Sequence, residues 1–202
     1  MKKLTIIGAS GHGKVVADIA KLNGYSEIVF LDDNEKLKAC GKYPVVGNCH
    51  EAIFHDNDCF VAIGNANIRK RIMNQYHDKT FPVLIHPDAV IAEGVSIGKG
   101  TVIMAGAVIN TDVKIGEGCI INTLSSVDHD CSVGDYVHIA VGAHLCGTVS
   151  VGNETWIGAG AIISNNIKIC NGSTIGAGSV VVKDVTVKGT YVGVPARLMN
   201  HN

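Results

Sequence analysis

The segment Asp128-His129-Asp130 places one imidazole between two carboxylates. An imidazole with a pKa of about 6.5 can accept a proton at neutral pH, and a neighbouring carboxylate can orient the ring and favour its protonated form. The segment is therefore a candidate general base that would deprotonate an amine or a hydroxyl nucleophile. Asp130 and Asp128 are alternative partners of the imidazole. The opposing interpretation is an ordinary surface histidine.

A second candidate site is the glycine-rich turn Gly8-Ala-Ser-Gly-His-Gly13, which follows an apolar run. A turn between a strand and a helix presents backbone N–H groups that suit a phosphate. The spacing is G-x-x-G-x-G and not the dinucleotide G-x-G-x-x-G, so we expect a phosphorylated ligand other than NAD, with a purely structural turn as the alternative. Asp32 and Asp33 lie about twenty residues further on and would accept hydrogen bonds from a ribose or a base, unless they are a solvated strand end.

The element that must position His129 is a six-residue repeat in the second half of the chain. From Ile85 to Val181 every sixth residue is a branched aliphatic, and the residue four positions later is small or β-branched. A period of six fits a short strand followed by a corner, and three such sides form one coil of about 18 residues. The repeat predicts a parallel β-helix over residues 85–186, with about 5.7 coils stacked by strand pairing. We expect the frequent glycine after the aliphatic to provide the unusual backbone conformation of the corners.

The coil length predicts which residues are stacked. Gly147 follows His129 by 18 residues, so its backbone is expected about 4.8 Å from the imidazole in the stacking direction. Trp156 is stacked on His138 in the same way and forms either the wall of a groove or part of a subunit interface.

The first eighty residues have a different pattern, in which apolar runs alternate with amphipathic stretches. We predict a small Rossmann-like βαβ domain. Its expected strands are residues 4–8, 27–33 and 59–64, and its expected helices are residues 14–22 and 68–76. The predicted fold is therefore an α/β domain at residues 1–82, followed by an all-β domain at residues 83–202 that contains the β-helix and a C-terminal tail.

Composition limits the class of partner. The net charge is −1 without a basic block, so we expect no nucleic-acid partner. No apolar stretch reaches membrane-spanning length and no signal peptide is recognisable, so we expect a cytoplasmic protein without membrane association. The seven cysteines include no C-x-x-C pair, which argues against a zinc site and a disulfide framework, and we expect no metal.

Three sequence features together resemble a known family: the opening Ile-Ile-Gly-Ala-Ser-Gly-His-Gly, the Ser125-Ser-Val-Asp-His-Asp130 segment within the hexapeptide repeat, and the ending Gly193-Val-Pro-Ala-Arg197. The chain resembles the bacterial sugar acyltransferases of the sialic-acid O-acetyltransferase type, whose β-helix is left-handed. Within that group it is similar to the N-acetyltransferases that use acetyl-CoA to acetylate a 4-amino group on a UDP-linked sugar in glycan biosynthesis.

The resemblance implies roles for individual residues. His129 would be the general base of a direct transfer, Asp130 would orient it, and the backbone N–H of Gly147 would bind the oxyanion. The implied assembly is a homotrimer with acetyl-CoA, the only cofactor, in the groove between adjacent β-helices. The expected acetyl-CoA contacts are His138, Gly147, Gly158, Ala159, Gly176 and Ala177. The expected contacts of the nucleotide-linked amino sugar are Ser10, Gly11, His12, Asp32, Asp33, Gly64 and Asn122.

Two other functions remain compatible with the sequence. One is O-acetylation of a sialic acid or another glycan hydroxyl, which needs the same base and oxyanion site. The other is a non-catalytic trimer that binds a nucleotide sugar. The sequence does not choose the nucleotide, the sugar or the glycan pathway.

Overall fold

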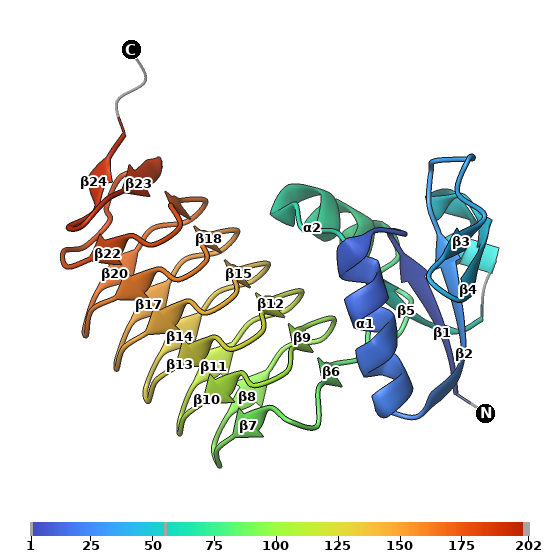
Figure 1. Ribbon diagram of the computed structural model, residues 1–202, viewed down its shortest axis with the longest axis horizontal. Coiled ribbons are helices and arrows are strands. Elements are labelled where there is room, and N and C mark those ends of the chain that lie inside the picture. The colour runs from blue at the N-terminus through green and yellow to red at the C-terminus, as the bar shows by residue number, and fades with distance from the viewer. Residues whose placement is uncertain (1, 55, 200–202) are drawn as a thin grey trace.

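The computed structural model describes residues 2–54 and 56–199. An N-terminal α/β domain and a β-helix lie side by side in Figure 1, with both helices of the α/β domain turned toward the β-helix. None of the described helices is long and apolar enough to cross a membrane.

The N-terminal domain is a five-stranded sheet with the strand order β3-β4-β2-β1-β5, in which only β3 is antiparallel to its neighbour. Its elements are β1 (Lys2–Ile7), α1 (Gly11–Leu22), β2 (Tyr25–Leu31), β3 (Ala39–Cys40), β4 (Tyr43–Gly47), the 3-10 helix η1 (Cys49–Phe54), β5 (Asp58–Val61) and α2 (Ala66–Gln75). The three strands and two helices predicted from the sequence are present. Elements β3, β4 and η1 were not predicted, because their short runs show no clear alternation of apolar and polar residues.

Helix α1 begins three residues before the predicted start at residue 14. Ser10 has extended backbone and caps the helix, since its side chain accepts a hydrogen bond from the Gly13 N–H at 3.4 Å. The Ser-Gly-His segment of the glycine-rich turn is thus the first turn of α1, at the carboxyl end of β1.

The β-helix has three faces, which we name by their first strands, and their strands are parallel except for β24, which is antiparallel to β23. The β6 face holds β6 (Leu84–Ile85), β9 (Val102–Ile103), β12 (Ile120–Ile121), β15 (His138–Ile139), β18 (Trp156–Ile157), β21 (Thr174–Ile175), β23 (Thr190–Val192) and β24 (Arg197–Leu198). The β7 face holds β7 (Val90–Ile91), β10 (Val108–Ile109), β13 (Ser126–Val127), β16 (His144–Leu145), β19 (Ile162–Ile163) and β22 (Val180–Val181). The β8 face holds β8 (Ser96–Ile97), β11 (Lys114–Ile115), β14 (Ser132–Val133), β17 (Ser150–Val151) and β20 (Lys168–Ile169).

Three edges join these faces. The first edge lies between the β6 and β7 faces, the second between the β7 and β8 faces, and the third between the β8 and β6 faces. From β6 to β22, strands in one face are paired with a register of 18 residues, as Ser126 with His144 shows, whereas β21 and β23 are paired with a register of 16 residues. The repeated aliphatic is the second residue of each strand and points into the core, where Ile139 and Ile157 are fully buried.

The expected role of the glycines that follow the aliphatics was wrong. The left-handed backbone occurs two residues later, at every sixth position from Gly94 to Gly178, and is adopted there by glycine and by other residues such as Asp130. Gly98 has no positive φ, but a Cβ on it would lie 2.5 Å from the Glu117 nitrogen in the next coil. Glycine is needed at that position because neighbouring coils approach closely, and not because of its backbone angles.

The two domains share apolar packing. Leu84, Val102 and Ile120 on the outside of the β6 face are buried in the same cluster as Val16 and Ala20 of α1. The N-terminal domain therefore covers part of the β6 face. The boundary between residues 82 and 83 stays a prediction.

Candidate active site

His129 lies on the second edge, directly after β13, with 51% of its side chain exposed. Its Nδ1 is 2.8 Å from Oδ2 of Asp130. This bond assigns the ring hydrogen to Nδ1 and leaves the Nε2 lone pair available to accept a proton. The hydrogen bond to Asp130, followed by the charge of Asp128, raises the pKa of His129 above its usual value.

The two candidate carboxylate partners have different functions in the structure. Asp130 has a φ of 58°, a left-handed conformation that aspartate tolerates better than most residues, and this conformation brings its short side chain to the imidazole. Asp128 instead accepts hydrogen bonds from the backbone N–H of His129 at 2.8 Å and from Asn110 Nδ2 at 2.7 Å. Asp130 is therefore the carboxylate bonded to the ring, while Asp128 is bonded to the backbone of the corner.

Gly147 lies against the imidazole, where the coil length predicts it. A Cβ at this position would be 2.6 Å from His129 Nε2. Among the described residues the Gly147 N–H has no hydrogen-bond acceptor, whereas the equivalent N–H groups of Asp135 and Asn153 on the third edge donate to side chains in the next coil. The second edge thus combines a proton acceptor with a free backbone donor.

His138 lies on the β6 face and is buried, with 9% exposed. Its Nε2 faces Asn122 Nδ2 at 3.2 Å, and its ring contacts that of Trp156 with centroids 4.4 Å apart. Asn122 Oδ1 accepts from the Thr123 N–H at 2.8 Å, so the amide donates to His138 Nε2 and the ring hydrogen is on Nδ1. Burial, then the charge of Arg69, lowers the pKa of His138 to about 3, so this imidazole is neutral at physiological pH.

His12, in the first turn of α1, lies close enough to His138 to contribute to that lowered pKa. Burial and the charge of Arg69 lower its own pKa to about 4. His12 Nε2 and His138 Nδ1 are both closed to solvent and have no hydrogen-bond partner among the described residues. Sequence reasoning treated these histidines as contacts of two different substrates, and the structure places them together where the two domains meet.

The remaining predicted acetyl-CoA contacts lie on the first edge. Gly158 and Gly176 follow β18 and β21 in consecutive coils, and a Cβ on Gly158 would lie 2.6 Å from the Ala177 nitrogen. The N–H groups of Ala159 and Ala177 donate to no described residue. In these two coils the first edge therefore offers unpaired backbone N–H groups and little side-chain bulk.

One chain does not bring His129 together with the predicted acetyl-CoA contacts of the first edge. His129 and Gly147 lie on the second edge, whereas Asn122, Gly158 and Gly176 lie on the first edge, across the β7 face.

The glycine-rich turn borders a cavity of about 480 Å³ at the carboxyl ends of β1, β2 and β5. Gly8 has a φ of +108°, and a Cβ on Gly13 would collide with the Phe30 ring, so these two glycines are required by the fold. Gly11 faces open space, since a Cβ on it would have no other atom within 4 Å. The N–H groups of Ser10, Gly11 and His12 have no acceptor among the described residues, and such donors suit an anion.

The carboxylates predicted to bind a ribose or base also support the local backbone. Asp32 accepts from the N–H groups of Ala9 at 2.8 Å and Asn34 at 2.9 Å. Asp33 Oδ1 accepts from the Cys49 N–H at 2.9 Å. Both residues line the 480 Å³ cavity together with Gly64.

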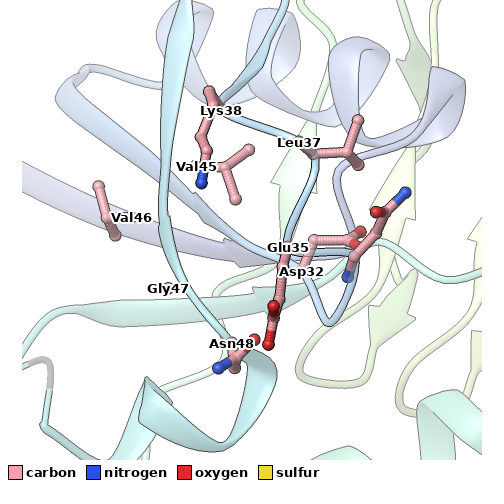
Figure 2. A pocket seen from close by; sticks show the side chains of 9 residues that line it. Asp32, Glu35, Leu37, Lys38, Val45, Val46, Gly47 and Asn48 are labelled. Atoms are coloured by element: carbon pink, nitrogen blue, oxygen red, sulfur yellow. The ribbon is translucent and has the colours of Figure 1, made fainter.

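Sequence reasoning missed Arg71, an exposed residue of α2 that is the only cationic side chain lining this cavity among the described residues. Its place beside the first turn of α1 depends on how α2 packs, which no local motif encodes. An adjoining cavity of about 300 Å³ shares Asp32 and is lined by the segment that holds β4, with Glu35, Lys38 and Asn48 (Figure 2).

No group of three or more His, Cys, Asp or Glu side chains in the described part of the chain is arranged to hold a metal ion.

Comparison with known proteins identifies the family. Residues 3–76 match the model of the PglD N-terminal domain, and residues 82–111 and 148–183 match the bacterial transferase hexapeptide (six repeats). The acetyltransferase domain of PglB from Neisseria gonorrhoeae FA1090 is 41% identical, with 98% of this chain and 100% of that chain covered and a TM-score of 0.95. The chain belongs to the PglD-type sugar N-acetyltransferase family.

Other members of the family match different shares of this chain. A variant of perosamine N-acetyltransferase from Caulobacter crescentus, in complex with CoA and GDP-perosamine, is 33% identical over 100% of this chain and 98% of that chain, with a TM-score of 0.94. UDP-N-acetylbacillosamine N-acetyltransferase from Bacillus subtilis (strain 168) is 36% identical over 113 residues, which are 52% of this chain and 52% of that relative. The match thus spans about half the length of the curated relative.

These findings confirm several predictions. The fold is an N-terminal α/β domain followed by a left-handed hexapeptide β-helix, and the family is that of acetyl-CoA-dependent N-acetyltransferases of nucleotide-linked 4-amino sugars. The roles of individual residues stay predictions.

Proposed function

We propose that this protein transfers the acetyl group of acetyl-CoA to the 4-amino group of a nucleotide-linked sugar, with His129 as the general base. The observation that carries this proposal is the cluster on the second edge. His129 has a free Nε2, its Nδ1 is bonded to Asp130, and the unpartnered Gly147 N–H is adjacent. An acyl transfer to an amine needs this combination of a proton acceptor and an oxyanion donor.

The proposed reaction is a direct transfer. His129 Nε2 removes a proton from the sugar ammonium, and the neutral nitrogen attacks the thioester carbonyl carbon. The carbonyl oxygen becomes an oxyanion that accepts a hydrogen bond from the Gly147 N–H. When the C–S bond breaks, the electron pair leaves with sulfur, and the imidazolium returns its proton to the thiolate. The attacking nitrogen releases its second proton to solvent, so the products are the amide, the CoA thiol and one proton. Asp130 stabilises the imidazolium between these two steps.

The nucleotide part of the substrate is proposed to bind the N-terminal domain. Its diphosphate fits the free N–H groups at the start of α1, with Arg71 as the counter-charge in the same cavity. The nucleoside would then lie beside Asp32 and Asp33, near the adjoining cavity. The relatives' names include both UDP- and GDP-linked sugars, so the nucleotide is left to experiment.

The active site is proposed to form between subunits of a homotrimer. The first and second edges of one chain are separated by the β7 face, so a single chain cannot place acetyl-CoA on Ala159 and the acceptor on His129 at once. A second copy that brings its second edge to the first edge completes the site. The apolar side chains exposed on or beside the β7 face fit such an interface. They are Val90, Leu124, Val141 and Ile162.

The test is turnover with defined acceptors. The protein is incubated with acetyl-CoA and with UDP-, dTDP- or GDP-linked 4-amino sugars, and thiol release is followed. We expect turnover with one nucleotide series and none with the matching 4-hydroxy sugars. Turnover only with a hydroxyl acceptor such as a sialic acid would support O-acetylation instead, and binding of a nucleotide sugar without any turnover would support a non-catalytic trimer.

A further inference from the structure

Arg69 is a buried cation between the two domains. Among the described Lys, Arg, Asp and Glu side chains it alone is buried, with 1% exposed. It lies in α2, two residues before Arg71, and faces the β-helix. Burying a charge is unfavourable unless polar partners surround it, so its surroundings must provide those partners.

The guanidinium of Arg69 donates to four backbone carbonyl groups. Within its own domain, Nη1 donates to Ile63 O at 2.7 Å and to Gly64 O at 3.0 Å. Across the domain boundary, Nε donates to Gly118 O at 2.6 Å and Nη2 donates to Tyr136 O at 2.8 Å. The acceptors on the β-helix are corners of the third edge, stacked one coil apart.

No described carboxylate is bonded to Arg69, which distinguishes it from a buried salt bridge. Burial lowers its pKa to about 10, so the side chain remains a cation at neutral pH. The charge is therefore stabilised by four backbone carbonyl oxygens, two from each domain. The planar guanidinium can satisfy all four at once, and a lysine ammonium, with three donors at one point, cannot.

The bonded backbone lies next to residues expected to contact each of the two substrates. Ile63 and Gly64 line the 480 Å³ cavity that we assign to the nucleotide. Tyr136 is two residues before His138, whose ring lies beside Trp156 on the β6 face. Arg69 thus connects the floor of the nucleotide cavity to the strand that carries His138.

We propose that Arg69 is a positioning residue that fixes the nucleotide cavity relative to the β-helix, so that a bound sugar reaches the acetyl donor. This inference rests on the proposed function. Arg69 contacts neither substrate, so its substitution should slow acetyl transfer without weakening the binding of either substrate. Each substrate alone should still bind its own domain, while the geometry needed for the reaction between them is lost.

The experiment compares Arg69→Lys and Arg69→Met in the full chain with Lys70→Gln as the matched control. Lys70 is adjacent on α2 and also joins the domains, through an ion pair with Glu154 at 2.5 Å, but 44% of its side chain is exposed. Measured quantities are kcat, the affinity for CoA alone, the affinity for the nucleoside diphosphate alone, and the midpoint of thermal unfolding.

For Arg69→Lys we expect kcat to fall by about 10-fold or more with both affinities within about threefold of wild type, because a misplaced reactant slows transfer without removing its binding site. Lys70→Gln should keep kcat within about twofold, since exposed ion pairs contribute little. Unchanged kcat in Arg69→Lys would overturn the inference, and so would a parallel loss of kcat and both affinities.

A second measurement separates this inference from the proposed function. Amide hydrogen exchange of residues 63–69 and 116–137 should accelerate together in Arg69→Lys, because the lost bonds join these segments. If the wild type shows no turnover, the proposed function fails while this exchange result still decides whether Arg69 fixes the two segments. If Arg69→Met does not fold, Arg69→Lys decides alone. If neither variant folds, the inference is overturned in favour of a purely structural role.

Discussion

The two domains of this protein position their candidate functional residues in different ways. In the β-helix, the six-residue repeat determines the position of each side chain. His129 and Gly147 are neighbours because they are 18 residues, or one coil, apart. In the N-terminal domain, the proposed nucleotide cavity lies where β1, β2, β5 and α2 meet, and no repeat relates Ser10 to Asp33 or Arg71.

This difference predicts different responses to substitution. In the periodic part a side chain is fixed by the stacking of coils above and below it, and a change should act locally on catalysis or on stacking. In the N-terminal domain the groups line one cavity that we propose binds the nucleotide, and a change should act mainly on the affinity for the nucleotide sugar.

The largest expected effect is on the rate after substitution of the base on the second edge. His129→Ala should lower kcat by roughly 10²- to 10⁴-fold, because it removes the group that deprotonates the sugar ammonium. The affinities for CoA and for the nucleoside diphosphate should be retained. Single-turnover acetyl transfer measures the rate and calorimetry measures the affinities. Full kcat in His129→Ala would show that the proposed base is wrong.

The contrasting substitution in the N-terminal domain is Arg71→Gln. It should raise the KM for the nucleotide sugar by about 10-fold with little change in kcat, because it removes one charge-assisted hydrogen bond to a phosphate, worth about 1.5 kcal/mol. Initial rates at varied nucleotide sugar measure this split. Lys21→Gln, at the other end of α1 from the cavity, is the matched control and should behave as wild type. A fall in kcat without a change in KM would contradict the assignment of the cavity.

Stability offers a third comparison between the domains. Gly134→Ala should destabilise the protein by about 1–3 kcal/mol, because its Cβ would lie 2.8 Å from the backbone nitrogen of Asn153 in the next coil. Gly11→Ala, which has open space around it, should change the free energy of unfolding by about 0.5 kcal/mol or less. Chemical denaturation measures both. Equal effects would mean that close stacking does not explain the glycines of the repeat.

The smallest expected effect is a shift in pH dependence. The hydrogen bond to Asp130 raises the pKa of His129, and a general base is active when it is unprotonated, so the acidic limb of kcat/KM should lie above the usual histidine value. Asp130→Asn should move that limb to lower pH. Asp128→Asn should move it less, because Asp128 acts on the ring through its charge alone. A limb that does not move in Asp130→Asn would contradict the orienting role of this carboxylate.

The sequence was sufficient for the β-helix because its period and its local contacts are encoded in consecutive residues. The faces, the inward aliphatics and the position of Gly147 beside His129 all follow from the spacing. The contact between His129 and Asp130 was also predicted, since the two residues are adjacent. The function of the repeat glycines was mistaken because the period alone does not say which of two positions has positive φ.

The parts that were missed depend on packing between segments that are distant in the chain. The burial of His138 follows from the N-terminal domain covering the β6 face, and the hexapeptide pattern shows only that the residue points outward. Arg69 and Arg71 lie in the helix predicted over residues 68–76, but neither residue has a local signal that distinguishes a buried cation from one that lines a cavity. These roles can be recognised only from how the two domains pack in the structure.

The central claim is that the base of one subunit deprotonates the amine that attacks acetyl-CoA bound to the first edge of another subunit, and complementation tests it most directly. His129→Ala removes the base, and Ala159→Trp blocks the exposed backbone of the first edge; each variant alone should be inactive. Trimers assembled from equal amounts of the two variants should regain about one quarter of wild-type activity, the fraction of sites with both intact edges under random assembly. Mixed trimers that remain inactive would contradict a site shared between subunits.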